Sequence, residues 1–202
     1  MAPSLVFVSR RTNDRKAMAM TVNTTAEHRS PATAPTGERA DLLAMLATHR
    51  HFLRFTTRDL DDEQAAARTT ASELCLGGLI KHVSAVEQGW ADFLVDGPSA
   101  LGDFDSLTEE DFARRADEFR MLPGETLAGV LDAYAEVARR TDELVAALPD
   151  LDATQPLPKA PWFQDAHWSV RRVLLHIIAE TAQHAGHADI IRESLDGAKS
   201  MG

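Results

Sequence analysis

Apolar residues recur at intervals of three and four along four long segments of the chain, at about residues 39–58, 72–95, 125–148 and 170–195. An α-helix turns by about 100° per residue, so this spacing gathers them on one helical face. No segment shows the strict alternation that is typical of a half-buried β-strand. A shorter helical pattern at about 108–120 lies in the connection between the second and third helices. The pattern predicts an all-α fold, a four-helix bundle with long connections.

The inward faces of the first two helices define part of the expected core. They carry Leu42, Met45, Leu46, His49 and Leu53 in the first helix, and Cys75, Leu79, His82, Val86 and Phe93 in the second. Gly78 lies beside His82 on the helical wheel, where a missing side chain lets a neighbouring backbone approach closely. The sequence therefore predicts space for a site beside His82.

Two segments have a composition that is not typical of helices: the N-terminus and the loop before the last helix. Residues 1–36 are rich in Ser, Thr, Pro and Ala without a hydrophobic period, which predicts a mobile leader followed by one bundle domain at 37–202. The apolar run at 5–8 is too short for the core of a signal peptide. Prolines hold the loop before the last helix open, and Ser169 is expected to cap that helix.

Charge and cysteine content exclude several classes of partner. The 202 residues, 44% of them hydrophobic, are enough for one ordinary core, and the formal net charge is -10. This charge repels phosphate backbones, so we expect no nucleic-acid partner. No apolar run approaches the length of a membrane span, which predicts no membrane partner. Cys75 is the single cysteine and is expected to be a small core residue, so the sequence favours a cytoplasmic protein.

The last helix carries the candidate chemistry in LLHIIAETAQHAGHADIIRE, residues 174–193. His176, Glu180, His184 and His187 follow one another at intervals of four, four and three, within an arc of about 80° on the wheel. Apolar residues share that arc, so these side chains are expected to point inward. Burying an unpartnered carboxylate costs on the order of several kcal/mol. A divalent cation between Glu180 and its histidines would remove this cost.

His82 supplies a third expected ligand, because it faces the core from the second helix. Together His82, Glu180 and His184 make a set of two imidazoles and one carboxylate, which leaves coordination positions open for a ligand. Zinc is preferred for this set, while nickel and iron(II) also accept it. We therefore predict a divalent-metal site formed by these three residues.

Each of these histidines has a structural alternative. A single inward histidine such as His49 or His176 is often only packed and hydrogen-bonded, and a metal-free bundle would need nothing more. His187 lies about 10 Å along the helix axis from Glu180, at 1.5 Å per residue. It is expected to line the pocket or support a ligand, with replacement of His184 as the alternative.

Two motifs carry a resemblance to a known family: LDDEQAAARTTASELCLGGLIKHVSAVEQGW and HWSVRRVLLHIIAETAQHAGHADIIRE. Through them residues 40–195 resemble the DinB-like superfamily, in particular its actinobacterial branch. The resemblance implies a four-helix bundle with a metal held by one His from the second helix and two residues one turn apart in the last. Glu180 and His184 match the Glu and His of the related mycothiol-dependent maleylpyruvate isomerases, and His82 matches the remaining ligand.

The resemblance implies two classes of function. The first is a metal-dependent thiol S-transferase or isomerase-type enzyme that uses a low-molecular-weight thiol such as mycothiol. The second is a non-catalytic metal-binding or ligand-binding protein related to stress. No residues can be assigned to a thiol or maleylpyruvate pocket, so the particular reaction and its catalytic residues stay unassigned.

Four aromatic residues are expected at the surface: Trp90, Trp162, Phe163 and Trp168. They are expected to line a pocket mouth or a dimer interface, or else to pack the proline-rich loop onto the bundle. Homodimers are common among DinB-like proteins, so the resemblance implies a homodimer.

Overall fold

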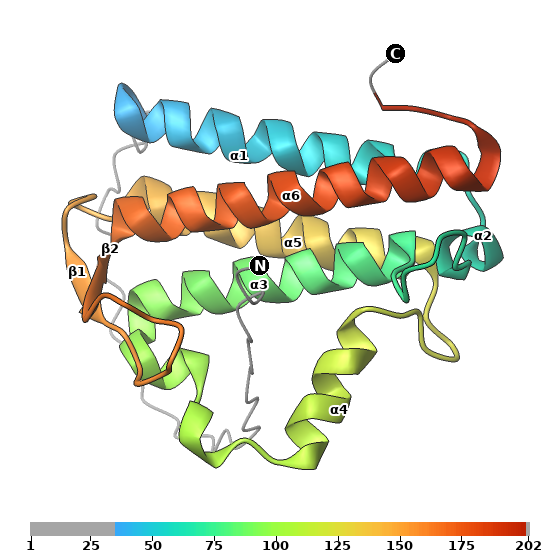
Figure 1. Cartoon of the computed structure of the whole chain (residues 1–202). Coiled ribbons are helices and arrows are strands. Elements are labelled where there is room, and N and C mark those ends of the chain that lie inside the picture. Colours follow the sequence, from blue (N-terminus) through green and yellow to red (C-terminus); the bar gives the residue numbers. More distant parts are fainter. Residues whose placement is uncertain (1–34, 201–202) are drawn as a thin grey trace, which may run out of the picture.

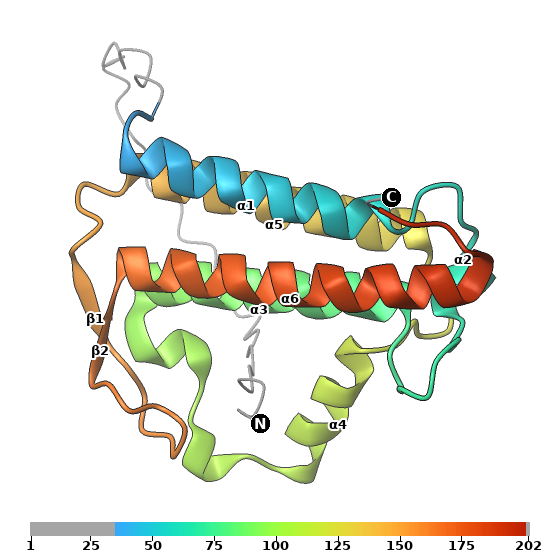
Figure 2. The ribbon, with the colours of Figure 1, turned by 45° about the horizontal axis from the view of Figure 1, so that its top comes forward.

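The computed structural model describes residues 35–200, and most of the expected leader at 1–36 lies outside this range. Four long helices form the body of the molecule: α1 (Glu38–Phe55), α3 (Leu76–Asp96), α5 (Leu127–Ala147) and α6 (Val170–Asp196). Helix α1 packs on α5 and α6, and α3 packs on the same two helices, which closes a four-helix bundle (Figures 1 and 2). The all-α prediction is confirmed.

The connections contain the shorter elements. Helix α2 (Asp62–Ala66) lies between α1 and α3, while two 3₁₀ turns (Gly97–Leu101 and Phe104–Ser106) and helix α4 (Glu109–Glu118) lie between α3 and α5. Figure 2 shows α4 outside the bundle, on the side of α3 away from α1. Thr108 and Asp111 form a capping box at the start of α4, which accounts for its beginning there.

A two-stranded antiparallel sheet, which the hydrophobic pattern did not predict, lies between α5 and α6. Strands β1 (Thr154–Pro156) and β2 (His167–Ser169) pair with Gln155 opposite Trp168. Each strand has three residues, too few for an alternating pattern to be recognised. Ser169 ends β2 and caps α6, its hydroxyl accepting a hydrogen bond from the Arg172 N–H, as the sequence predicted.

The core consists of two apolar clusters separated by buried polar residues. One cluster lies toward the strands and includes Trp90, Phe93 and Ile177, and the other lies toward α2 and includes Leu79 and Tyr134. Between them along the helices lie buried polar side chains, namely Arg50, Glu87, Thr141, Thr181 and His184. The bundle therefore holds a polar layer in its middle, which is where a polar site can be built.

Two expected positions on α1 were wrong. Met45 is 48% exposed, and His49 is only half-buried. The buried positions of α1 are Leu42, Leu46, Arg50 and Leu53. Met45 lies at the edge of this stripe, so the wheel alone could not separate it from the core.

The aromatic residues expected at the surface do not all lie there. Trp90 and Trp168 are buried, and their rings stack with centroids 4.8 Å apart. Phe163 from the proline-rich loop packs edge-on against Trp168 at 5.7 Å. The loop-packing alternative is therefore confirmed for Trp168 and Phe163. Among the described helices, none combines the length and the apolar character that crossing a membrane requires.

Candidate metal centre

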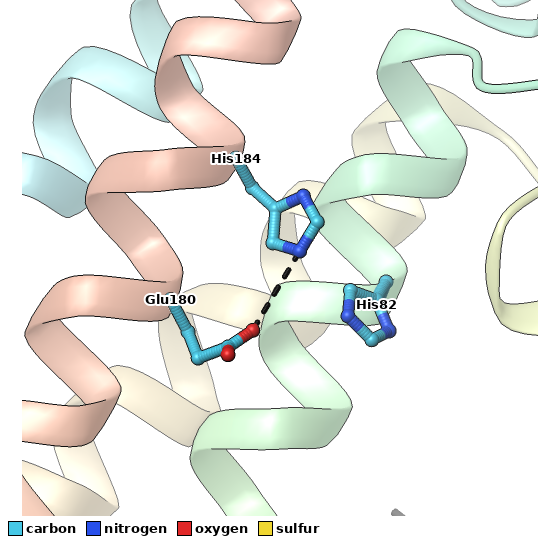
Figure 3. Close-up of side chains that lie close together, drawn as sticks. All are labelled: His82, Glu180 and His184. Carbon is cyan, nitrogen blue, oxygen red and sulfur yellow. Dashed lines mark ion pairs between the residues drawn. The ribbon is translucent and has the colours of Figure 1, made fainter. Parts of the chain in front are cut away.

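His82 on α3 and the pair Glu180 and His184 on α6 bring their donor atoms together, no two of them more than 4.8 Å apart (Figure 3). The packing of α3 on α6 creates this meeting point, and the four-residue interval on α6 places Glu180 and His184 one turn apart on the same face. The His82 and His184 rings meet edge to face at 4.9 Å. All three sequence-predicted donors thus converge.

His82 uses its two ring nitrogens differently. Its Nδ1 lies 3.3 Å from Oε2 of Glu118, at the end of α4, and the Phe119 ring stacks on it at 4.1 Å. Its Nε2 is buried and has no hydrogen-bond partner among the described residues. Because a carboxylate only accepts hydrogen bonds, this contact assigns the proton to Nδ1 and leaves a lone pair on Nε2.

His184 also has one ring nitrogen in contact with a neighbour and one without a partner among the described residues. Its Nδ1 lies 3.4 Å from Nδ1 of His187, whereas its buried Nε2 has no hydrogen-bond partner in the described part of the chain. The Glu180 Oε2 atom lies 3.7 Å from that Nε2, which is an ion-pair distance and too long for a hydrogen bond. His187 therefore supports His184, and the three-donor cluster does not include it.

The two buried Nε2 atoms test whether the residues fit a metal. Leaving a buried polar atom unsatisfied costs about 1–3 kcal/mol. Imidazole nitrogen and carboxylate oxygen are ordinary ligands of zinc, at about 2.0–2.2 Å. In the tetrahedral geometry that zinc prefers, two donors at that distance lie about 3.4 Å apart. Donor atoms that lie up to 4.8 Å apart would therefore move together by roughly 1 Å on binding. The donor set fits a divalent ion.

Burial of His82 and the contact between Glu180 and His184 set the protonation of the site. Desolvation lowers the pKa of His82, and the hydrogen bond with Glu118 opposes this shift. Interaction with His184 lowers the pKa of Glu180, although partial burial raises it. The histidine is thus held in its neutral form and the glutamate in its ionised form, and these are the forms that bind metal.

His176 lies one turn before Glu180 but outside the three-donor cluster. Its ring packs edge-on against Trp90 at 5.0 Å and Trp168 at 5.2 Å. Burial lowers its pKa, and its Nε2 has no hydrogen-bond partner among the described residues. His176 therefore borders the site from the aromatic side.

Helix α4 and its C-cap contribute three residues that the sequence pattern did not indicate: Arg115 and Glu118 in the helix, and Phe119 directly after it. The Arg115 guanidinium lies 4.0 Å from Glu118 and 5.8 Å from the Phe119 ring, and burial lowers its pKa. The one signal in the sequence was Gly78, where a close backbone approach was expected. A Cβ at Gly78 would lie 2.0 Å from the Phe119 carbonyl oxygen, so that expectation is confirmed.

A groove of about 610 Å³ lies between α3 and α5, and Glu118 forms part of its wall. It is lined by charged side chains that include Lys81, Glu136 and Arg140, and by none of the three donors. A molecule in this groove would touch Glu118 and not the donor atoms.

Comparison with known families places this geometry in context. A family model for mycothiol S-transferases matches residues 41–197. The chain belongs to the mycothiol S-transferase family. The DinB-like resemblance of the two motifs is thereby confirmed, since this family is DinB-like and related to mycothiol enzymes. A comparison with curated proteins gave no match. The region shared with the mycothiol S-transferases contains all three donors and the whole of α4.

Proposed function

We propose that the protein is a divalent-metal-dependent thiol S-transferase that uses mycothiol or a similar low-molecular-weight thiol. One observation carries the proposal: two buried imidazole Nε2 atoms without hydrogen-bond partners among the described residues converge with Glu180. Membership in the mycothiol S-transferase family supports the choice of thiol and reaction class.

His82, Glu180 and His184 would hold the ion, with zinc preferred and nickel or iron(II) compatible with the same ligands. When bound, such an ion lowers the pKa of a coordinated thiol and makes thiolate available near neutral pH. The protein's own part is to fix the three donors. His187 orients the His184 ring, and Trp90 and Trp168 cover His176 beside Glu180.

The charges at the site favour an anionic sulfur. With neutral His82 and His184, Glu180 cancels one of the two charges of a divalent ion. Arg115 and Glu118, which lie beside each other, add opposite charges. One positive charge remains, and a single thiolate neutralises it.

The test compares thiol conjugation with and without metal. Wild-type protein stripped of metal is assayed with mycothiol and a bimane electrophile, before and after addition of Zn²⁺. We expect zinc to restore the rate in the wild type and not in His82→Ala, while His51→Ala, an exposed histidine on α1, behaves as wild type. Unchanged rates in His82→Ala would reject the proposal.

Metal content is measured beside the rates. We expect the wild type to bind about one equivalent of Zn²⁺ and Glu180→Gln to bind far less, because the amide lacks the charge that balances the ion. Glu193→Gln, an exposed position on the same helix, is the control and should retain the metal.

A second function is a metal-binding or ligand-binding protein without turnover. The deep burial of two donors favours it, since His82 is 0% and His184 is 5% exposed. Cobalt substitution separates the two functions. A visible spectrum that changes when mycothiol is added supports the transferase, and an unresponsive spectrum supports the second function.

We further propose that the protein acts as a homodimer in the cytoplasm. The homodimer comes from the resemblance to DinB-like proteins, and the single cysteine, which is buried, is compatible with a reducing compartment. Light scattering coupled to size-exclusion chromatography tests the dimer.

A further inference from the structure

We propose that Glu118 is a positioning residue, which fixes the His82 ring so that Nε2 faces the shared centre. This inference rests on the proposed metal site and adds a residue from a helix outside the bundle. Glu118 would act through His82 and not as a ligand, because the three-donor cluster does not include it.

The end of α4 is fastened to the first turns of α3 by several independent contacts. The Lys81 ammonium donates to the carbonyl oxygens of Asp117 at 3.1 Å and Arg120 at 2.9 Å. The Cys75 thiol contacts the Phe119 carbonyl oxygen at 3.7 Å. That carbonyl rests on Gly78, where there is no room for a side chain. Glu118 is therefore held in place by its neighbours on both sides.

Two of these anchored residues restrict the His82 ring. Phe119 stacks on its face at 4.1 Å, which limits rotation of the ring out of its plane. Glu118 accepts from Nδ1 at 3.3 Å, which distinguishes the observed orientation from one flipped by 180°. These contacts fix the orientation of the His82 ring and favour one tautomer. The unprotonated Nε2 then faces α6 without a hydrogen-bond partner among the described residues.

Hydrogen bonds of this kind matter to metal binding because a histidine ligand must present one particular nitrogen without its proton. Removing such a supporting acceptor typically lowers metal affinity by about 10–100-fold. Glu118 meets the chemical requirement, and its side chain is only 23% exposed, so water competes weakly for the same nitrogen.

The experiment uses three variants of the full chain. Glu118→Leu removes the acceptor, Glu118→Gln keeps an acceptor oxygen without the charge, and Glu110→Leu places the same apolar change on the exposed side of α4. Zn²⁺ affinity is measured by competition with a chromophoric chelator. The tautomer of His82 is measured separately in metal-free protein by ¹⁵N NMR.

We expect Glu118→Leu to weaken Zn²⁺ binding by about 10–100-fold, Glu118→Gln to fall between it and the wild type, and Glu110→Leu to match the wild type. The NMR should show the Nδ1–H form of His82 in the wild type and a shift toward Nε2–H in Glu118→Leu. Equal affinity and an equal tautomer in wild type and Glu118→Leu would overturn the role of Glu118 and leave the metal site standing. Absence of Zn²⁺ binding by the wild type would overturn the proposed function and this inference with it.

Discussion

Arg50 on α1 and Glu87 on α3 form an ion pair inside the bundle, with Arg50 Nε 3.0 Å from Glu87 Oε2. The Arg50 side chain is 7% exposed and that of Glu87 is 0% exposed. Arg50 also reaches Asp142 of α5 at 2.8 Å, so a single guanidinium connects three helices. These contacts belong to the polar layer between the two apolar clusters.

Replacing Arg50 by Leu should destabilise the fold by about 3–5 kcal/mol, because Glu87 would be left as an uncompensated buried charge. Urea unfolding followed by circular dichroism measures the change. Arg139→Leu is the matched control, since within residues 35–200 Arg139 pairs only with exposed glutamates of its own helix and should alter stability little. A loss no larger than that of the control would show that Glu87 is satisfied in another way.

Gly78→Ala should lower the free energy of unfolding by about 1–3 kcal/mol, since its Cβ would meet the Phe119 backbone, which cannot rotate away. Gly186→Ala on α6 offers the opposite case, because nothing lies within 4 Å of the added Cβ. That variant should gain about 0.5–1 kcal/mol from helix propensity. Thermal melting measures the change in stability of both variants. Equal changes of the same sign would contradict the close packing of Gly78 against the Phe119 backbone.

The sequence was enough to predict the four bundle helices, the Ser169 cap and the three donor residues that converge between α3 and α6. Each of these depends on the face or the end of a single helix, which periodicity records directly. That His82, Glu180 and His184 hold a metal stays a prediction.

The contribution of α4 could not be read in the same way. Its ten residues are mostly polar, and Glu118 gives no sign that it will contact His82, 36 positions earlier. The buried Arg50 was missed for a related reason, since a charged residue in an apolar stripe is normally assigned to solvent. Only long-range packing reveals the partner that makes such burial tolerable.

His176→Phe should retain bound Zn²⁺ within about twofold of the wild type, because His176 does not belong to the three-donor cluster. Phenylalanine preserves the aromatic packing against Trp90 and Trp168. Chelator competition measures the affinity. A tenfold loss would instead make His176 a fourth ligand and reduce the number of open coordination positions.

Acid should weaken the contact that Arg171 makes with Glu38 and Asp152. Hydrogen bonding to Arg171 lowers the pKa of both carboxyl groups below their ordinary values of 4.5 and 3.8. The unfolded chain therefore takes up protons first as pH falls, so the stabilisation present at neutral pH is lost progressively below about pH 4.5.

Arg171→Gln should consequently reduce the urea midpoint at pH 7 and differ little from wild type at pH 3. Lys159→Gln, an exposed position with no ion pair among the described residues, should show no such pH dependence. A difference between Arg171→Gln and wild type that stays constant from pH 7 to pH 3 would assign the effect to packing.

Helices α3 and α6 belong to opposite halves of the chain, yet the three donors lie across their junction. An ion shared by those donors would bind only the folded chain, and it would add about 2.7 kcal/mol of stability at a free concentration one hundred times its dissociation constant. Under the proposed function, a cell starved of metal would lose the protein to proteolysis as well as losing its activity, so its abundance would follow the metal supply.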